Sequence, residues 1–231
     1  LGSLYIIMEI KVTVADESHI KYAEDICKEI YISSLERKTG IANRTPEYIC
    51  EKIRAGKAVI ALAIPDKAAT VPDEASTVPD ESSTSQDEAG SKQESKDKTE
   101  QENGSAQPDG KFAGFSYIES WGGKSFVANS GLIVAHEFRG LGVAKKIKEQ
   151  TFILSRHLFP DAKIFSITTG AAVMKMNYEF GFRPVPYTEL TDDPEFWKGC
   201  EGCRHFDILK SHDYKMCICT GLLYDPKEHL E

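Results

Sequence analysis

Residues 134–150, VAHEFRGLGVAKKIKEQ, join an apolar segment to a basic amphipathic helix through a short loop with two glycines. Because glycine has no Cβ, Gly140 and Gly142 let backbone N–H groups approach a ligand closely. The unpaired N–H groups of the first helical turn follow directly, and the helix dipole favours negative charge there. Arg139 and the two lysines after the loop add positive charge. The unit predicts a phosphate or diphosphate site; a glycine turn that only packs the helix is the alternative.

The pattern of apolar residues predicts an α/β chain. Alternating or continuous short apolar runs indicate strands, and apolar residues at helical spacing indicate helices. Candidate caps at Asp16 or Ser18, and at Thr45 before Pro46, mark two helix starts. The predicted strands cover residues 8–15, 57–64, 111–120, 124–135, 162–168, 182–190 and 216–224, of which 182–190 is a broken edge strand. The predicted helices cover residues 16–33, 45–55, 141–158 and 170–180.

An acidic low-complexity segment separates the second and third predicted strands. Residues 66–109 hold 12 of the 36 acidic residues and 4 of the 28 basic ones, so they account for the whole net charge of −8. The segment has a short tandem repeat, TVPDEAS at 70–76 and TVPDESS at 77–83, and little to bury. Such a composition is typical of disorder. We interpret residues 66–110 as an inserted, lengthened turn of a hairpin, with a docking role as the alternative.

The loop and the element order together resemble the GCN5-related N-acetyltransferase superfamily. Its signature, Arg/Gln-x-x-Gly-x-Gly/Ala between the fourth strand and third helix, matches residues 139–144, and its later Gly-Phe matches Gly181-Phe182. The resemblance implies one acyltransferase domain over residues 8–231. Its expected fold is a mixed, mostly antiparallel twisted sheet flanked by helices, interrupted by the insertion and followed by an extension at 190–231.

The resemblance also implies an acyl-CoA cosubstrate, acetyl-CoA or a related thioester. Backbone groups of Leu132 and Val134 are expected to pair with the pantetheine arm, at a point where their strand splays from its neighbour. The diphosphate is expected on the signature loop, Arg139, Gly140, Leu141, Gly142, Val143 and Ala144.

The catalytic groups are less clear from the sequence. Acyl transfer to an amine needs a base for the ammonium and an acid for the leaving thiolate. The family often places a tyrosine four residues before the glycine of Gly-Phe, but here that position is Asn177, and Tyr178 follows about 100° around the helix. Asn177 and Tyr178 are both candidates for contact with the thiolate. Glu119 is the candidate base, with the loop residue Glu137 or an ordered water as alternatives.

Four cysteines near the C-terminus suggest a second site. Cys200-x-x-Cys203 is followed after thirteen residues by Cys217-x-Cys219. On a strand, Cys217 and Cys219 would present both thiols to one face. Four thiolates suit structural zinc, which would staple the tail to the sheet. Ordinary buried thiols are the alternative.

The acceptor is the least constrained feature. The chain also resembles a narrower group of short acyltransferases that act on glutamate in bacterial arginine synthesis, the N-acetylglutamate synthase-like group. A small-molecule amine, an amino acid in particular, is therefore the expected acceptor, and it would need cationic partners. The candidates are Arg37, Lys38, Arg44, Lys175 and Arg183.

Other functional classes stay open. The domain could be an acyl-CoA-binding regulator without catalysis, a protein N-acetyltransferase, or a zinc-stapled interaction module. Outside residues 66–109 acidic and basic residues balance, which argues against a nucleic-acid surface. No run approaches the ~18 apolar residues that span a bilayer, and the cysteine content suits the cytoplasm. The sequence leaves the oligomeric state open, a homodimer included.

Overall fold

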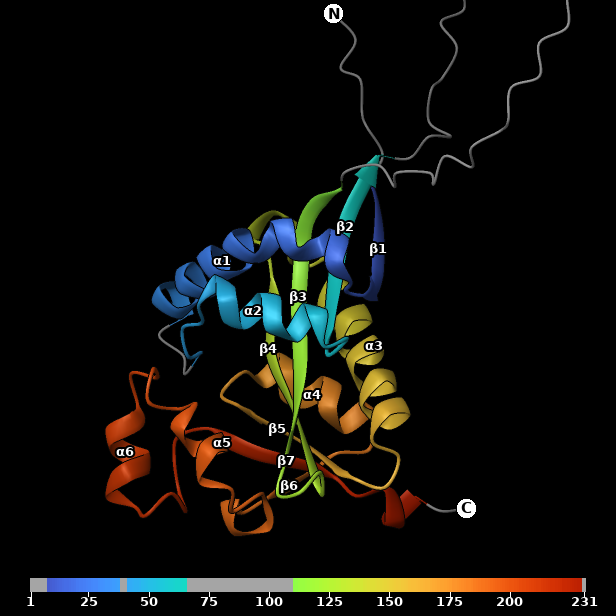
Figure 1. Cartoon of the computed structure of the whole chain (residues 1–231). Helices are drawn as coiled ribbons and strands as arrows, with labels where there is room; N and C mark the ends of the chain where they lie inside the picture. The colour runs from blue at the N-terminus through green and yellow to red at the C-terminus, as the bar shows by residue number, and fades with distance from the viewer. Residues whose placement is uncertain (1–7, 38–40, 66–109, 230–231) are drawn as a thin grey trace, which may run out of the picture.

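The computed structural model describes residues 8–37, 41–65 and 110–229 (Figure 1). These residues form one seven-stranded sheet in the order β1-β2-β3-β4-β5-β7-β6. Only β4 and β5 are parallel; the other neighbours are antiparallel. The mixed, mostly antiparallel sheet expected from the sequence is confirmed. The strands are β1 (Met8–Val14), β2 (Ala58–Pro65), β3 (Lys111–Trp121), β4 (Phe126–Val134), β5 (Lys163–Thr168), β6 (Arg183–Val185) and β7 (Thr220–Tyr224).

Helices cover both faces of the sheet. On β3, Tyr117 and Glu119 meet side chains of α2, whereas a Cβ at Gly114 would meet Ile147 of α3. Successive strand residues face opposite sides, so α2 and α3 lie on opposite faces. In Figure 1, α1 and α2 lie across β3 and β4, and α5 and α6 lie apart from them, at the lower left beside β5 and β7. The helices are α1 (Ala23–Arg37), α2 (Pro46–Arg54), α3 (Val143–Leu158), α4 (Ala171–Glu179), α5 (Pro194–Lys198) and α6 (Phe206–Ser211), with 3₁₀ turns η1 (Glu17–Tyr22), η2 (His136–Phe138), η3 (Tyr187–Glu189) and η4 (Pro226–His229).

The two helix starts predicted at Asp16 and Thr45 are confirmed, and each has a side-chain cap. The carboxylate of Asp16 accepts the Ser18 N–H at 3.0 Å and opens η1, which continues into α1. The hydroxyl of Thr45 accepts the Tyr48 N–H at 3.3 Å and opens α2, with Pro46 at the first position. Both caps satisfy donors that the first helical turn leaves unpaired.

The C-terminal part departs from the prediction. The last strand was expected at 216–224, but β7 begins at Thr220 and inserts between β5 and the predicted edge strand, β6. Two short helices, α5 and α6, precede it and were not predicted. They surround an apolar cluster in which Trp197 stacks on Tyr187 and donates its indole N–H to the Thr191 carbonyl at 3.0 Å. Aromatic packing, not helix periodicity, holds these short helices, so the sequence pattern does not reveal them.

The parallel pair β4–β5 is joined over only three residues. Phe126–Ala128 pair with Lys163–Phe165, and beyond that point the two strands separate. The β3–β4 ladder shifts register close by, between Phe115 and Tyr117. The rest of β4, which includes Leu132, thus presents a backbone edge that β5 does not pair. The splayed strand expected from the resemblance is present.

The predicted insertion, residues 66–110, lies outside the described residues except for Gly110. Its flanking strands pair across the gap, since Ala63 lies opposite Lys111 in the antiparallel β2–β3 ladder. We therefore expect that deleting residues 68–108 and closing the hairpin with a short turn changes the midpoint of urea unfolding little, because closure entropy varies slowly with loop length. A large loss of stability on deletion would contradict this expectation.

Candidate active site

One cavity of about 540 Å³ lies where β4 and β5 separate. Its walls come from β3, β4, β5, the loop before α2, the start of α4 and the C-terminal segment. Arg44, Tyr117 and Glu119 line one part, and Trp197 and the cysteines of the C-terminal segment line another. A cavity of this size, largely apolar with a few polar groups, is typical of a small-molecule site.

The glycine loop has the conformation that an anion site requires. Gly140 and Gly142 have φ values of +82° and +76°, which side chains other than glycine rarely adopt. A Cβ at either position would meet nothing within 4 Å, so the loop faces open space. The Gly142 carbonyl accepts hydrogen bonds from the backbone N–H groups of Lys145 and Lys146, at 3.1 and 3.3 Å. The N–H groups of Val143 and Ala144 precede them and lie at the positive end of the α3 dipole.

The side chain of Arg139 is engaged elsewhere. Its guanidinium binds Glu29 at 2.8 Å and Glu36 at 2.9 Å, and its Nε donates to the Val134 carbonyl at 3.1 Å. The charge that Arg139 is expected to add for a diphosphate is thus compensated by two carboxylates of α1, and Arg139 anchors the loop to that helix. Anion binding by the loop stays a prediction that rests on its backbone N–H groups.

Two buried asparagines border the gap between β4 and β5. Leu132 lines the cavity, whereas Val134 is buried and its carbonyl is taken by Arg139. In the described ranges, the buried side-chain atoms without a hydrogen-bond partner include Asn129 Nδ2 and both amide atoms of Asn177. Asn129 follows the last β4 residue paired with β5, and Asn177 lies on the same face of α4 as Val173, which lines the cavity. Unpaired buried amides are costly, so these groups fit a polar ligand.

Tyr178 lies on a different side of α4. Half of its surface is exposed, whereas Asn177 is fully buried, and neither residue lines the cavity. Contact of Asn177 with a ligand stays a prediction, which its unpaired buried amide favours over contact of Tyr178.

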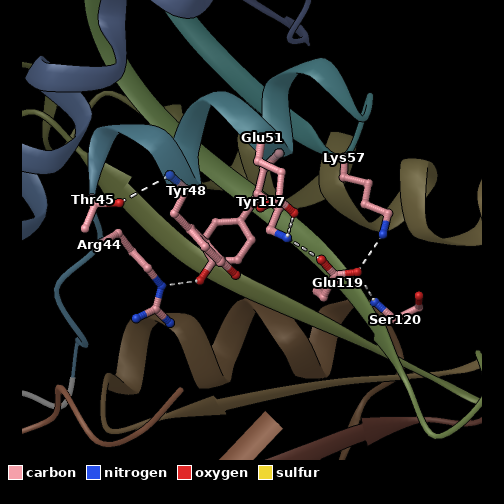
Figure 2. Close-up of polar contacts among 9 residues, drawn as sticks. Arg44, Thr45, Tyr48, Glu51, Lys57, Tyr117, Glu119 and Ser120 are labelled. Carbon is pink, nitrogen blue, oxygen red and sulfur yellow. Dashed lines mark hydrogen bonds and ion pairs between the residues drawn. The ribbon is translucent and has the colours of Figure 1, made fainter. Parts of the chain in front are cut away.

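Glu119 is held by two lysines (Figure 2). Its carboxylate accepts hydrogen bonds from Lys52 and, at 2.5 Å, from Lys57, and its Oε1 also accepts the Ser120 N–H. Burial alone would raise the pKa of Glu119, but these hydrogen bonds outweigh it and hold the pKa below its usual value. Lys52 also binds Glu51, at 3.0 Å. A carboxylate kept ionised in this way is a weak proton acceptor, and the two lysines compensate its negative charge.

An arginine and two tyrosines lie beside this ion-pair cluster (Figure 2). Arg44 Nε donates to the Tyr117 hydroxyl at 2.9 Å, and the guanidinium carbon lies 5.4 Å from the centre of the Tyr48 ring. The Tyr48 and Tyr117 rings meet edge to face, 5.5 Å apart. Burial raises the pKa of Tyr48, so its phenol stays neutral. Of the predicted acceptor cations, Arg44 lines the cavity; Arg183 pairs with Glu189 and Glu228, and Lys175 is exposed. The side chain of Arg37 and the whole of Lys38 lie outside the described residues.

The cysteines gather at the cavity without forming a metal centre. Cys200, Cys203, Cys217 and Cys219 all line its wall. Within the part of the chain that the structure describes, however, no group of three or more His, Cys, Asp or Glu side chains is arranged to hold a metal ion. Cys217 and Cys219 also precede β7 instead of lying on it. The structure therefore does not support the predicted zinc site. The tail is held to the sheet by β7 and by aromatic packing.

The thiols should behave as protonated, metal-free groups. Burial raises the pKa of Cys200 to about 11 and of Cys219 to about 12, and neighbouring thiols add to both shifts. At pH 8 we expect iodoacetamide to alkylate Cys200 about 100-fold and Cys219 about 1,000-fold more slowly in the native protein than in urea, because the thiolate reacts. Peptide mass spectrometry over time measures both rates. A native rate that increases when a chelator is added would instead indicate bound metal.

Of three comparisons with known proteins, the one with solved structures gave matches, and these share one fold. A scan against protein-family models gave no match, and a search of curated proteins gave none. Solved structures do match: the N-acetylglutamate synthase of Neisseria gonorrhoeae, complexed with coenzyme A and N-acetylglutamate, has a TM-score of 0.53 at 12% identity over 94% of this chain. This chain spans 35% of that protein.

Two further structures match over nearly their whole length. The putative acetyltransferase YncA of Salmonella typhimurium, with acetyl-CoA, has a TM-score of 0.52 at 12% identity and covers 96% of this chain and 97% of its own. The diaminobutyrate acetyltransferase of Paenibacillus lautus, with diaminobutyric acid and coenzyme A, has a TM-score of 0.50 at 9% identity, with 95% and 96% covered. The chain thus has the GCN5-related N-acetyltransferase fold that its loop and element order predict. No helix in the described ranges is long and apolar enough to cross a membrane.

Proposed function

We propose that this protein is an acyl-CoA-dependent N-acyltransferase that transfers an acetyl or related acyl group to the amine of a small molecule. The observation that carries the proposal is the left-handed glycine loop at the start of α3, which follows β4, the strand that separates from β5 and lines the cavity. Backbone N–H groups at a helix start bind diphosphate, and an unpaired strand edge binds the amides of a pantetheine arm. The gap then leads the thioester to the cavity.

In this proposal, different groups take part in different steps of the acyl transfer. The acceptor amine attacks the thioester carbonyl carbon, the C–S bond breaks, and the thiolate leaves. The buried side-chain amide of Asn177 donates a hydrogen bond to the leaving thiolate. Glu119 is bound by two lysines and its lowered pKa makes it a poor base, so the ammonium proton leaves through water.

We propose an amino acid as the acceptor, with the α-amino group of glutamate, as in arginine synthesis, as the first candidate. The support is the resemblance to glutamate acyltransferases and the position of Arg44 on the cavity wall. Two proteins of the same fold were solved with amino-acid ligands, N-acetylglutamate and diaminobutyric acid. The aromatic C-terminal segment forms part of the wall, which favours a small acceptor over a protein lysine.

A binding protein without catalysis is the second candidate. Two observations favour it: the lysines that weaken Glu119 as a base, and an asparagine at the position where the family often has tyrosine. Titration calorimetry with coenzyme A, followed by product mass spectrometry with acetyl-CoA and succinyl-CoA against an amino-acid panel and a lysine peptide, separates the candidates. Turnover of one amino acid supports the enzyme, binding without turnover supports the regulator, and absence of coenzyme A binding contradicts both.

A further inference from the structure

Arg44 is a half-buried cation without an acidic partner. Its Nε donates to the Tyr117 hydroxyl at 2.9 Å and its Nη1 to the Asn43 carbonyl at 3.0 Å, and both acceptors are neutral. Over the described ranges, no carboxylate lies within ion-pair distance of its guanidinium, whereas Arg54, Arg139 and Arg183 each have one. Among the described residues, Nη2 of Arg44 has no hydrogen-bond acceptor. The guanidinium therefore keeps donor capacity toward the cavity that it lines.

The neighbouring charges do not compensate Arg44. Glu119, which lines the same cavity, is already bound by Lys52 and Lys57, and Glu51 is bound by Lys52. The other carboxylate that lines the cavity, Glu195, is bound by Lys198. Three cations and two carboxylates therefore leave one positive charge in this network. A partly buried charge without a counter-ion is costly, which favours an anion in the cavity.

The surrounding residues hold the guanidinium in place. It packs against the rings of Tyr48 and Tyr117, with its central carbon 5.4 and 6.0 Å from their centres. Gly131, with φ +66°, makes room for this arrangement, because a Cβ there would lie 2.5 Å from the Tyr117 ring. Arg44 is thus fixed before any ligand arrives, which reduces the entropy lost on binding.

We infer that Arg44 binds a carboxylate of the acceptor and so restricts the proposed reaction to amines that carry one. This inference rests on the proposed function. Guanidinium groups bind carboxylates through two parallel hydrogen bonds, so Arg44 matches a carboxylate in charge and shape. Tyr117 and Glu119 lie two residues apart on β3 and face the same side, so Arg44 and the lysine-bound Glu119 lie on one wall with a net positive charge. An amino acid has a carboxylate that this wall attracts, whereas a simple amine or polyamine has none.

The test compares Arg44→Met and Arg44→Lys with the wild type. We expect Arg44→Met to raise KM for glutamate about 100-fold, because one partner of a charged hydrogen-bonded pair is lost, and Arg44→Lys to have a smaller effect. The wild type should prefer glutamate strongly to 4-aminobutanamide, an amine without a carboxylate, and Arg44→Met should remove most of this preference in kcat/KM. Arg183→Met is the matched control, since Arg183 is ion-paired and does not line the cavity. An unchanged KM for glutamate and the other amino acids of the panel in Arg44→Met overturns the inference while the proposed function stands.

A binding measurement separates this inference from the proposed function. Trp121 and Trp197 line the cavity, so their fluorescence reports glutamate binding without acyl-CoA. Saturable binding by the wild type that Arg44→Met weakens about 100-fold supports the carboxylate site even if no turnover is found. Equal binding by both proteins, or no binding of any amino acid in the panel by the wild type, overturns it. Coenzyme A affinity and the unfolding midpoint should stay constant in Arg44→Met, which excludes misfolding as the cause.

Discussion

Gly142→Asp should weaken coenzyme A binding at least about 100-fold while the protein stays folded. Gly142 has φ +76° and precedes α3, and its position faces open space, so an aspartate side chain would project beside the N–H groups of the first turn. The carboxylate would occupy the place of the diphosphate and repel it. Titration calorimetry with coenzyme A measures the loss of affinity.

Two controls separate charge from backbone strain. Gly142→Asn has nearly the same shape without the charge, and asparagine tolerates left-handed backbone, so it should lose less affinity. Gly123→Asp places the same charge at another left-handed glycine, φ +63°, whose Cβ would also meet nothing within 4 Å. Gly123 lies in the turn between β3 and β4, so coenzyme A binding should be unaffected. Wild-type affinity in folded Gly142→Asp would contradict the loop assignment.

Glu119→Leu should lower the free energy of unfolding by about 3 kcal/mol, because the variant leaves Lys52 buried without its main counter-ion. Lys52 is 4% exposed, and its remaining partner, Glu51, is mostly in solvent. The double variant Glu119→Leu/Lys52→Met should recover most of the loss, since both members of the buried pair are then replaced by apolar groups. Urea unfolding of the wild type, Glu119→Leu, Lys52→Met and the double variant measures these differences, and additive losses in the double variant would contradict the pairing.

The pH dependence of this effect has a defined direction. The pKa of Glu119 is lower in the folded protein than its ordinary value of 4.5. Its ion pairs therefore stabilise the fold fully above that ordinary value and are lost as the pH falls through the lowered one. The difference in stability between the wild type and Glu119→Gln should be largest near neutral pH and shrink below about pH 4. A difference that stays constant from pH 7 to pH 3 would contradict the lowered pKa.

The sequence predicts those parts of the site that local patterns encode. Glycines at fixed spacing before an amphipathic helix are such a pattern, and so are the caps at Asp16 and Thr45. The polar cluster is different, because Lys52 and Lys57 reach Glu119 across 67 and 62 residues, and Arg44 reaches Tyr117 across 73. Such partners are set by strand register, which periodicity does not specify.

The role of Arg139 and the zinc prediction show the same limit. The signature places Arg139 next to the glycines, but its ion pairs with α1 depend on packing across more than 100 residues of sequence. The spacing of the four cysteines is compatible with a metal, but the thiols lie on segments whose positions follow from Trp197, Tyr187 and their aromatic neighbours. Side chains of the same type at ligand-like spacing do not fix the angles between them.

The place of β7 in the sheet has a consequence for how the chain is made. β5 needs β7 on its open edge, and β6 pairs only with β7 among the described strands, although β7 is the last strand in the chain. During synthesis β5 therefore leaves the ribosome about fifty residues before its partner, and at typical elongation rates it waits several seconds with exposed N–H and C=O groups. Ribosome pausing near Thr220, or a nonsense mutation just before it, would leave the unpaired edge of β5 open to aggregation with neighbouring nascent chains. The yield of this protein in a cell should thus depend on chaperones that hold nascent chains more than its equilibrium stability would suggest.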